Sequence, residues 1–248
     1  MNIKKLVYFL FLPLLITILT ACAEGSSTTG QSDNQTEEKQ DGGELHVAYN
    51  AQPPNLDPQS NTNLATRDIG YHIFETLLTL NESLEVEPML AESYDISEDG
   101  KTITFHLREG VTFHNGEEMT ADDVIASMER WQELSASAQT YLKGTTYEAV
   151  DDYTVNAHIE NPTTLDLYIF ADLTQFAAIM PKDVIESADS EFVEEYVGTG
   201  PYKLDEWRQD QYILLTRHED YQSRTEPANG LSGEKKALMD EVYFYFVP

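Results

Sequence analysis

The sequence predicts an α/β fold in which antiparallel hairpins are grouped in the middle of the chain. Apolar residues alternate with polar ones, as is typical of strands, at residues 45–49, 103–107, 153–159, 212–216 and 242–247. Other segments place apolar residues three and four positions apart, as amphipathic helices do, at residues 64–79 and 120–131. The pair Asp99-Gly100 separates two alternating segments, which favours a hairpin.

Residues 1–21 predict a signal peptide for export. Lys4 and Lys5 precede an apolar stretch at residues 6–19 that only Pro13 and Thr17 interrupt. As a helix this stretch would extend about 21 Å, which is too short to span a hydrocarbon core of roughly 30 Å. A basic start, a short apolar segment and small residues after it are typical of a secretory signal.

The segment Leu19-Thr20-Ala21-Cys22 resembles the lipobox of bacterial lipoproteins, in which the cysteine is acylated and becomes the new N-terminus. Cys22 is the single cysteine of the chain, so an internal disulfide, a cysteine zinc site and a CxxC motif are excluded. The alternatives are an ordinary signal peptide with an incidental cysteine and an uncleaved anchor. We predict lipidation at Cys22 and a lipid anchor on the extracytoplasmic face of the cell membrane.

A flexible tether is expected at residues 22–43, ahead of a folded body at 44–248. Residues 23–43 contain no large apolar side chain, so they cannot bury enough surface to offset the entropy lost on ordering. Cleavage after residue 21 removes Lys4 and Lys5 and no acid, which leaves 13 of the 15 basic residues against 44 acidic ones and changes the net charge from −29 to −31. Such a charge disfavours nucleic-acid partners and contact with anionic lipid headgroups.

The folded body is expected to begin with the strand at 45–49 and a stiff loop. Pro53, Pro54 and Pro58 exclude regular structure directly after the strand. The helix expected at 64–79 has one broad apolar face, formed by Leu64, Ile69, Ile73, Leu77 and Leu78.

An antiparallel meander is expected next. The segment 94–96 leads through a turn at 97–101 to the strand at 103–107, and turns at 109–110 and 115–116 continue it past Val111 and Phe113. Thr120 and Asp123 then form the pattern of a capping box, which starts the helix at 120–131. Asp122 and Asp123 are interpreted as carboxylates that favour a helix N-terminus rather than as an acid–base pair.

The remaining segments predict helices and strands in mixed order. After the strand at 153–159, residues 164–178 are expected to be helical, and Pro181 precedes a short helix at 182–188. A turn at 197–202 leads into a strand whose partner is 212–216, and an aromatic strand at 242–247 ends the sequence.

No residue pattern indicates catalysis, a metal or a cofactor. The six histidines lie at positions 46, 72, 106, 114, 158 and 218, and none belongs to an HExxH motif. His106 and His114 flank a turn, but cross-hairpin packing is preferred to a metal site. The segment 198–201 lacks the third glycine and the strand–helix context of a phosphate loop, and no GxSxG is present. We predict that the chain is not an enzyme.

Several segments together resemble the bacterial extracellular solute-binding proteins of family 5, the dipeptide, oligopeptide and nickel type that serves ABC importers. The matching residues occur in the family's order and spacing at Pro54-Asn55-Leu56-Asp57-Pro58, 74–78, 88–94, 97–101, 104–116, Thr120-Ala121-Asp122-Asp123-Val124, Gly198-Thr199-Gly200-Pro201-Tyr202-Lys203-Leu204 and 240–242. Each pattern is modest alone, but the ordered series is specific.

The resemblance implies a periplasmic-binding-protein type II fold, with two lobes and an extra subdomain, that closes over a peptide or another small solute. It implies an ABC permease and its ATPase subunits as partners. The first strand and the regions 160–180 and 198–248 would build part of the first lobe, and residues of about 60–160 the subdomain. Family members are much longer, so the sequence is expected to hold most of the first lobe and to lack the second. The aromatic terminal strand is then expected to be an unpaired edge prone to association.

Ligand-facing residues are expected in the loop after the first strand, at Asn50, Ala51, Gln52 and Pro53, because α/β sheets present ligands at the carboxyl ends of their strands. Four further side chains could supply stacking or polar contacts, with ordinary packing as the alternative: Trp131, Tyr141, Gln175 and Phe176.

Three functional hypotheses follow from these patterns. The first is a lipoprotein that captures peptides or a related small solute for an ABC importer. The second is a surface sensor or adhesion lipoprotein that uses the same lobe for protein contacts. The third is a truncated binding protein that does not trap ligand. Peptide, nickel, haem, glutathione and sugar all occur as ligands in the family, so the solute stays open.

Overall fold

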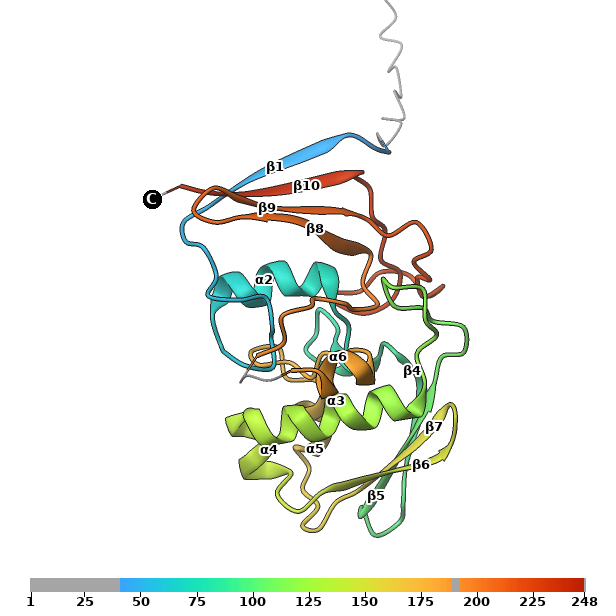
Figure 1. Ribbon diagram of the computed structural model, residues 1–248. Helices are drawn as coiled ribbons and strands as arrows, with labels where there is room; N and C mark the ends of the chain where they lie inside the picture. Colours follow the sequence, from blue (N-terminus) through green and yellow to red (C-terminus); the bar gives the residue numbers. More distant parts are fainter. Residues whose placement is uncertain (1–40, 189–191, 248) are drawn as a thin grey trace, which may run out of the picture. The chain divides into compact units, whose positions relative to one another are not determined.

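Figure 1 shows the computed structural model, which describes residues 41–188 and 192–247. Residues 41–248 form one compact unit, and the fold described below is that of this unit. The predicted signal peptide, Cys22 and the tether as far as residue 40 lie outside the described residues. In the part that the structure describes, no helix has the length and apolar character needed to cross a membrane.

The first sheet joins the two ends of the described chain. Its strands are β1 (Glu44–Tyr49), β8 (Tyr202–Arg208), β9 (Tyr212–Arg217) and β10 (Glu241–Phe246), in the order β1-β10-β9-β8. β1 runs parallel to β10, and the other neighbours are antiparallel. These strands confirm the alternating patterns at both ends of the folded body.

The expectation that the terminal strand is an unpaired edge is wrong. Val242 of β10 lies opposite Leu45 of β1 on one side and Leu215 of β9 on the other. Val242 and Phe244 are buried, so β10 is central, and β1 and β8 are the edges of the sheet. Alternation shows that a strand is half-buried, but it does not show which strands flank it.

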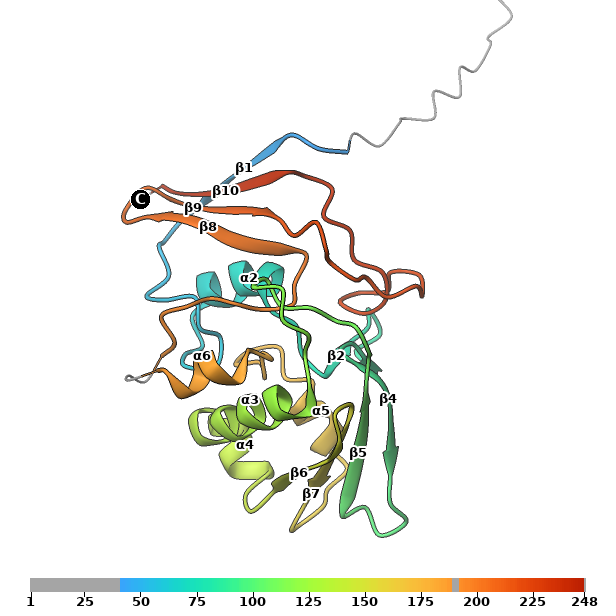
Figure 2. The same cartoon turned by 45° about the vertical axis from the view of Figure 1, so that its right-hand side comes forward.

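Helix α2 (Leu64–Ile73) packs against the inner face of the first sheet (Figure 1, Figure 2). The Asn63 side chain caps it, because its Oδ1 accepts hydrogen bonds from the N–H groups of Ala65 and Thr66 at 2.9 and 3.4 Å. Ile69 and Ile73 have no exposed surface, whereas Leu64, which the sequence placed on the same face, is 60% exposed.

The predicted helix at 64–79 is therefore too long, since α2 ends at Ile73. Gly198 and Gly200 lie against its last turn, and the N–H of Gly200 donates to the carbonyl of Ile73 at 2.9 Å. A Cβ at Gly198 would lie 2.2 Å from the same oxygen, so only glycine fits there. The chain continues in an extended form, in which the carbonyl of Leu77 accepts from the N–H of Met89 at 2.9 Å. The end of α2 therefore depends on the segment 198–200, more than a hundred residues away.

The second sheet has four antiparallel strands in the order β4-β5-β7-β6. They are β4 (Ala91–Ile96), β5 (Thr102–Leu107), β6 (Thr146–Asp151) and β7 (Thr154–His158), and a small pair, β2 (Leu78–Leu80) with β3 (Val86–Pro88), precedes them. The predicted hairpin at 94–107 is confirmed, with Gly100 at a φ of 72° in its turn.

The predicted meander does not continue beyond that hairpin. Residues 111–118 form only a tight loop with an isolated bridge between Thr112 and Glu118. The second edge of β5 pairs with β7 instead. Val111 and Phe113 are buried in the adjacent core, so their alternation reflects burial rather than a third strand.

Helix α3 (Ala121–Leu134) packs on the second sheet, and α4 (Ala136–Tyr141) follows it directly. The capping box is confirmed: the Asp123 carboxylate accepts hydrogen bonds from the N–H and the hydroxyl of Thr120, both at 2.9 Å. The short helix after Pro181 is confirmed as α6 (Lys182–Glu186).

The long helix predicted at 164–178 is wrong, because only α5 (Asp166–Phe170) forms there. Residues 176–180 are not helical, and their backbone groups bond to three other segments. The N–H of Ile179 donates to the carbonyl of Glu75 at 3.0 Å, the carbonyl of Ala178 accepts from Gln59 at 2.8 Å, and the N–H of Met180 donates to Ser127 at 2.9 Å. These contacts outweigh the local apolar pattern.

The described interior has two apolar cores. One lies between the second sheet and α3 and includes the fully buried Phe105 and Trp131. The other lies between the first sheet and α2 and includes Ile69 and Phe176. Each such side chain contributes about 1.5–3 kcal/mol when it is fully buried. Helix α2, which falls inside the subdomain predicted at about 60–160, packs in the first-sheet core, and the domain boundaries stay a prediction.

Candidate ligand-binding site

The parallel strands β1 and β10 end at the same edge of the first sheet. The N–H of Val247 donates to the carbonyl of Tyr49 at 2.8 Å, which keeps the two chain segments together beyond the strands. Residues 50–53, here called the edge loop, leave the sheet at this point. Asn50 and Ala51 are exposed, Gln52 is half-buried and Pro53 is buried. The carboxyl ends of parallel strands are where α/β sheets present ligands.

The side chain of Gln52 ties the edge loop to the turn between β8 and β9. Its amide nitrogen donates to the Gln209 side-chain oxygen at 2.6 Å. Its amide oxygen accepts from the backbone N–H of Asp210 at 2.6 Å and from the indole of Trp207 at 3.4 Å. Three contacts on one amide thus join the edge loop to this turn.

Aromatic and charged groups surround this edge. The rings of Tyr196 and Trp207 lie 6.3 Å apart. The Tyr49 hydroxyl donates to Asp68 at 2.6 Å, and Arg67 donates to the same carboxylate at 2.8 and 3.0 Å. Burial and the hydrogen bond to Asp68 raise the pKa of Tyr49 to about 12. Burial alone would raise the pKa of Asp68, but the hydrogen bonds from Tyr49 and Arg67 outweigh it and lower that pKa.

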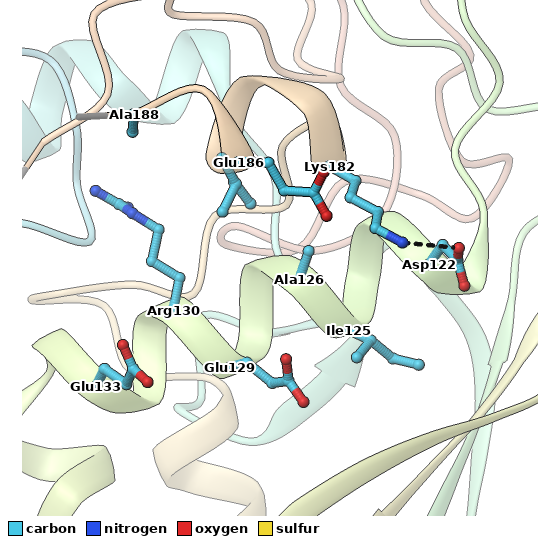
Figure 3. A pocket seen from close by; sticks show the side chains of 10 residues that line it. Asp122, Ile125, Ala126, Glu129, Arg130, Glu133, Lys182, Glu186 and Ala188 are labelled. Carbon is cyan, nitrogen blue, oxygen red and sulfur yellow. Dashed lines mark hydrogen bonds and ion pairs between the residues drawn. The ribbon is translucent and has the colours of Figure 1, made fainter. Parts of the chain in front are cut away.

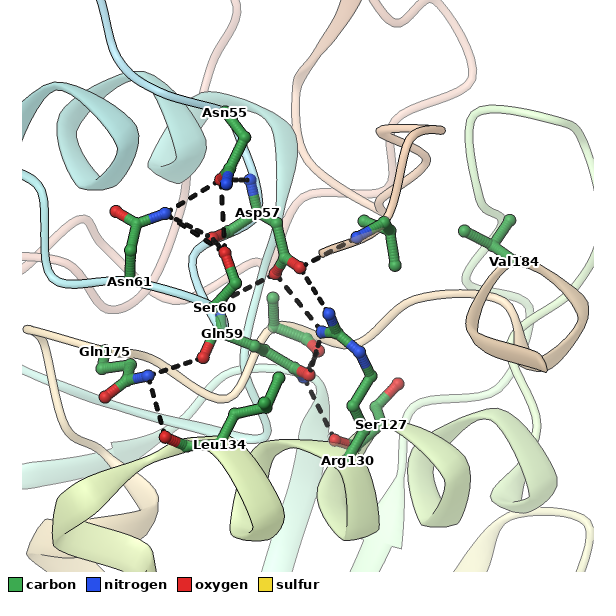
Figure 4. Close-up of polar contacts among 12 residues, drawn as sticks. Asn55, Asp57, Gln59, Ser60, Asn61, Ser127, Arg130, Leu134, Gln175 and Val184 are labelled. Atoms are coloured by element: carbon green, nitrogen blue, oxygen red, sulfur yellow. Dashed lines mark hydrogen bonds and ion pairs between the residues drawn. The ribbon is translucent and has the colours of Figure 1, made fainter. Parts of the chain in front are cut away.

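A buried polar network holds the chain just after the edge loop (Figure 4). The Asp57 carboxylate, whose side chain has no exposed surface, pairs with Arg130 of α3 at 2.5 Å. It also accepts the N–H groups of Gln59 at 3.0 Å and Val193 at 3.1 Å. A buried carboxylate needs such donors, because an unpaired charge in the interior is strongly destabilising.

Gln59 extends this network to two further segments. Its side-chain nitrogen donates to the carbonyls of Ser127 at 3.1 Å and Ala178 at 2.8 Å, and its side-chain oxygen accepts from Arg130 at 2.8 Å. Its backbone carbonyl accepts from Gln175 at 2.6 Å. The segment after the edge loop, α3 and the segment at 175–180 are thereby joined.

Three of the four further predicted residues belong to this interior and not to the exposed edge. Trp131 is fully buried and its indole donates to the carbonyl of Gln175 at 2.7 Å. Phe176 is fully buried and stacks on Tyr71 at 4.4 Å. Tyr141 lies apart on α4 and is 44% exposed. Trp131 and Phe176 are thus packed in the core, which was the alternative to ligand contact. Contact of any of the four residues with a ligand stays a prediction.

A hollow of about 440 Å³ lies between α3 and α6 (Figure 3). Its lining residues include Ile125 and Ile185, and an ion pair between Lys182 and Asp122 at 3.1 Å lies at one end. Its charged groups are of both signs, and its lining residues include no part of the edge loop. The hollow is therefore separate from the candidate site.

The histidines do not form a metal site in the part of the chain that the structure describes. His106 lies 3.0 Å from Asp95 on the exposed side of the second sheet. His114 packs instead edge to face with His218, 4.9 Å away, so His106 and His114 do not meet. Over residues 41–188 and 192–247, no group of three His, Cys, Asp or Glu residues could hold a metal ion.

Comparison with known families decides the wider identity. The family model described as bacterial extracellular solute-binding proteins, family 5 Middle, matches residues 85–248. The chain belongs to this family. Membership confirms the resemblance found in the sequence, and members of this family are extracellular binding proteins rather than enzymes.

Relatives with assigned roles support the same family. The chain is 28% identical over 220 residues to the oligopeptide-binding protein AppA of Bacillus subtilis, which covers 85% of this chain and 40% of AppA. It is 28% identical over 181 residues to the glutathione-binding protein GsiB of Escherichia coli, which covers 72% of this chain and 35% of GsiB. The chain thus spans less than half the length of these family 5 relatives.

Solved family 5 structures share the fold. The periplasmic binding protein DppA of Helicobacter pylori, in complex with the peptide STSA, matches with a TM-score of 0.70 and 30% identity over 86% of this chain and 44% of DppA. The structure of AppA from Bacillus subtilis with a nonapeptide matches with a TM-score of 0.68 and 28% identity over 84% and 41%. The described fold is therefore part of the periplasmic-binding-protein type II fold, as expected.

The sequence did not identify the residues that hold the edge of this family 5 fold. Trp207, Gln209 and Asp210 lie more than 150 residues from Gln52, and nothing local to them indicates the contact. Asp57 was noted only as part of a matching segment. Its position between two apolar or proline residues, Leu56 and Pro58, was the available signal that this carboxylate is buried and needs a partner.

Proposed function

We propose that the chain is the solute-binding lipoprotein of an ABC importer and that it captures peptides at the edge loop. The observation that carries the proposal is the edge at the ends of β1 and β10, where Gln52 joins a loop with two exposed residues to Trp207 and Asp210. Extended peptides bind through backbone hydrogen bonds and side-chain pockets. Asn50 and Ala51 are exposed in this loop, so a peptide can reach them from solvent.

Peptides are preferred to other solutes because two peptide complexes are among the similar structures at 28–30% identity. Glutathione, the solute named for GsiB, is itself a small peptide. The absence of a candidate metal group among the described residues gives no positive support to a metal solute.

Anchoring and delivery complete the proposal. Lipid attached at Cys22 would hold the body at the outer surface of the membrane, with residues 22–43 as the tether. The loaded protein would then deliver its solute to the ABC permease, whose ATPase subunits drive import. The net charge of −31 after cleavage, on 13 basic and 44 acidic residues, favours a body that stands away from anionic headgroups.

Isothermal titration of the purified chain tests the binding step. The probes are the tetrapeptide STSA, a nonapeptide, glutathione and haem, with Gln52→Ala as the variant that releases the edge loop. We expect saturable heat with the peptides and weaker binding by Gln52→Ala. Saturable binding of haem and none of the peptides would overturn the peptide assignment, and binding of no probe would overturn the proposed function of this chain.

A further inference from the structure

The segment from the edge loop to Asp57 has few free backbone torsions. Pro53 and Pro54 at its start, and Pro58 directly after Asp57, fix their own φ angles and have no backbone N–H. Between them, the Asn55 side-chain oxygen accepts from the N–H of Asp57 at 3.0 Å. These restraints leave few torsions that could absorb a shift at Asp57 before it reaches Gln52.

Each end of this segment has its own anchor. At the exposed end, Gln52 is held by Trp207 and Asp210 at the β8–β9 turn. At the buried end, two guanidinium nitrogens of Arg130 lie 2.5 and 3.4 Å from the two carboxylate oxygens of Asp57 (Figure 4). Paired donors of a planar guanidinium fix orientation as well as distance.

We propose that Arg130 and Asp57 are positioning residues for ligand binding: the pair sets the position of the edge loop from α3. The inference rests on the proposed function and deepens it. Neither residue lies in the edge loop, and the Asp57 side chain has no exposed surface, so the pair acts through the loop and not by touching the solute. A preorganised loop pays less ordering entropy when ligand binds.

The first measurement is made without ligand. The chain has two tryptophans, so 5-fluorotryptophan labelling gives one ¹⁹F signal for Trp131 and one for Trp207, and Trp207→Phe assigns them. In Arg130→Met we expect the Trp207 signal to move, because its indole is bonded to Gln52. Amide exchange at the non-proline residues of 50–56, which are 50–52, 55 and 56, should become about tenfold faster, as expected when a local opening becomes easier.

Lys182→Met is the matched control. Lys182 lines the same hollow as Arg130 (Figure 3), but it pairs with the exposed Asp122 and does not contact the edge loop. Both readouts should stay as in the unmodified chain. If Arg130→Met does not fold, Asp57→Asn keeps the shape of the side chain and should give a smaller shift of the same kind. An unmoved Trp207 signal with unchanged exchange at 50–56, in a folded variant of either residue, overturns the proposal.

The second measurement adds the peptide STSA. We expect Arg130→Met to bind it about tenfold more weakly, as for a loop that has lost its preorganisation, while Lys182→Met binds it as the unmodified chain does. Absence of peptide binding by the unmodified chain would overturn the proposed function, whereas the ligand-free signals still decide whether the pair positions the loop. Equal affinities in Arg130→Met and the unmodified chain would overturn the positioning role in binding.

Discussion

Acid should destabilise the fold through His114. Its Nε2 lies 3.0 Å from the carbonyl of Gly200 and its Nδ1 lies 3.3 Å from the N–H of Gly198. One nitrogen donates and the other accepts, which assigns the neutral ring. Protonation would turn Nδ1 into a donor facing the Gly198 N–H, and it would place a charge beside His218, with Lys203 also near. Burial accordingly lowers the pKa of His114 from 6.5 to about 4.

The magnitude follows from linkage. Between the unfolded pKa of 6.5 and the folded pKa of about 4, the unfolded chain binds the proton and the folded chain does not, so the free energy of unfolding falls as pH falls through this window. At ~1.4 kcal/mol for each pKa unit, the full loss is about 3 kcal/mol. Because the ring is only partly buried, this value is an upper bound. It corresponds to a fall in Tm of roughly 6–12 °C for a domain of this size.

Urea unfolding at pH 7, 5.5 and 4 measures this loss in the unmodified chain and in His114→Gln. The difference in the free energy of unfolding between the two proteins is taken at each pH. It cancels the pH dependence that the 44 acidic residues contribute to both. We expect the unmodified chain to lose up to about 3 kcal/mol relative to His114→Gln on going from pH 7 to pH 4. His106→Gln, on the exposed side of the second sheet, controls for the loss of a histidine. A difference that stays constant from pH 7 to pH 4 would refute the argument.

Three other substitutions, with Gly116→Ala as a control, test the fold and the anchor. Gly198→Ala should lower the free energy of unfolding, measured by urea titration, by about 1–3 kcal/mol or more, because its Cβ would lie 2.2 Å from the carbonyl oxygen of Ile73. Gly116→Ala has nothing within 4 Å of its Cβ, so it should lower the same free energy by less, through its positive φ alone. Phe105→Ala should cost about 3–5 kcal/mol in the same assay, since its ring is fully buried. Cys22→Ser should abolish incorporation of labelled palmitate and release the protein from the membrane fraction, and continued labelling would exclude lipidation at this position.

Local chemistry sufficed where a few neighbouring residues determine the structure. Asp99-Gly100 forms the expected hairpin turn, and Thr120 with Asp123 forms the expected cap, because each is completed within four residues. The end of α2 at Ile73 could not be predicted, because it depends on a hydrogen bond from Gly200. The same reason explains why residues 164–178 did not form the long helix that their apolar pattern favours.

The candidate site, too, could be predicted from the sequence only in part. The edge loop could be predicted from its place after the first strand, because the rule for α/β sheets needs only the order of the strands. Its anchors could not, because Gln52 meets Trp207, and Asp57 meets Arg130, across separations of 155 and 73 residues. Trp131 was singled out for its ring, whereas its burial in the core became visible only from the fold.

The pairing of β1 with β10 also determines when the first sheet can form. Gly43, just before β1, is bonded to Asp240 across 197 residues, so β1 has no partner in the sheet until β10 has been synthesised. At about 5–20 residues per second, that interval is on the order of 10–40 s. The first sheet therefore stays incomplete during that interval, because the neighbour of β1 in the sheet is β10.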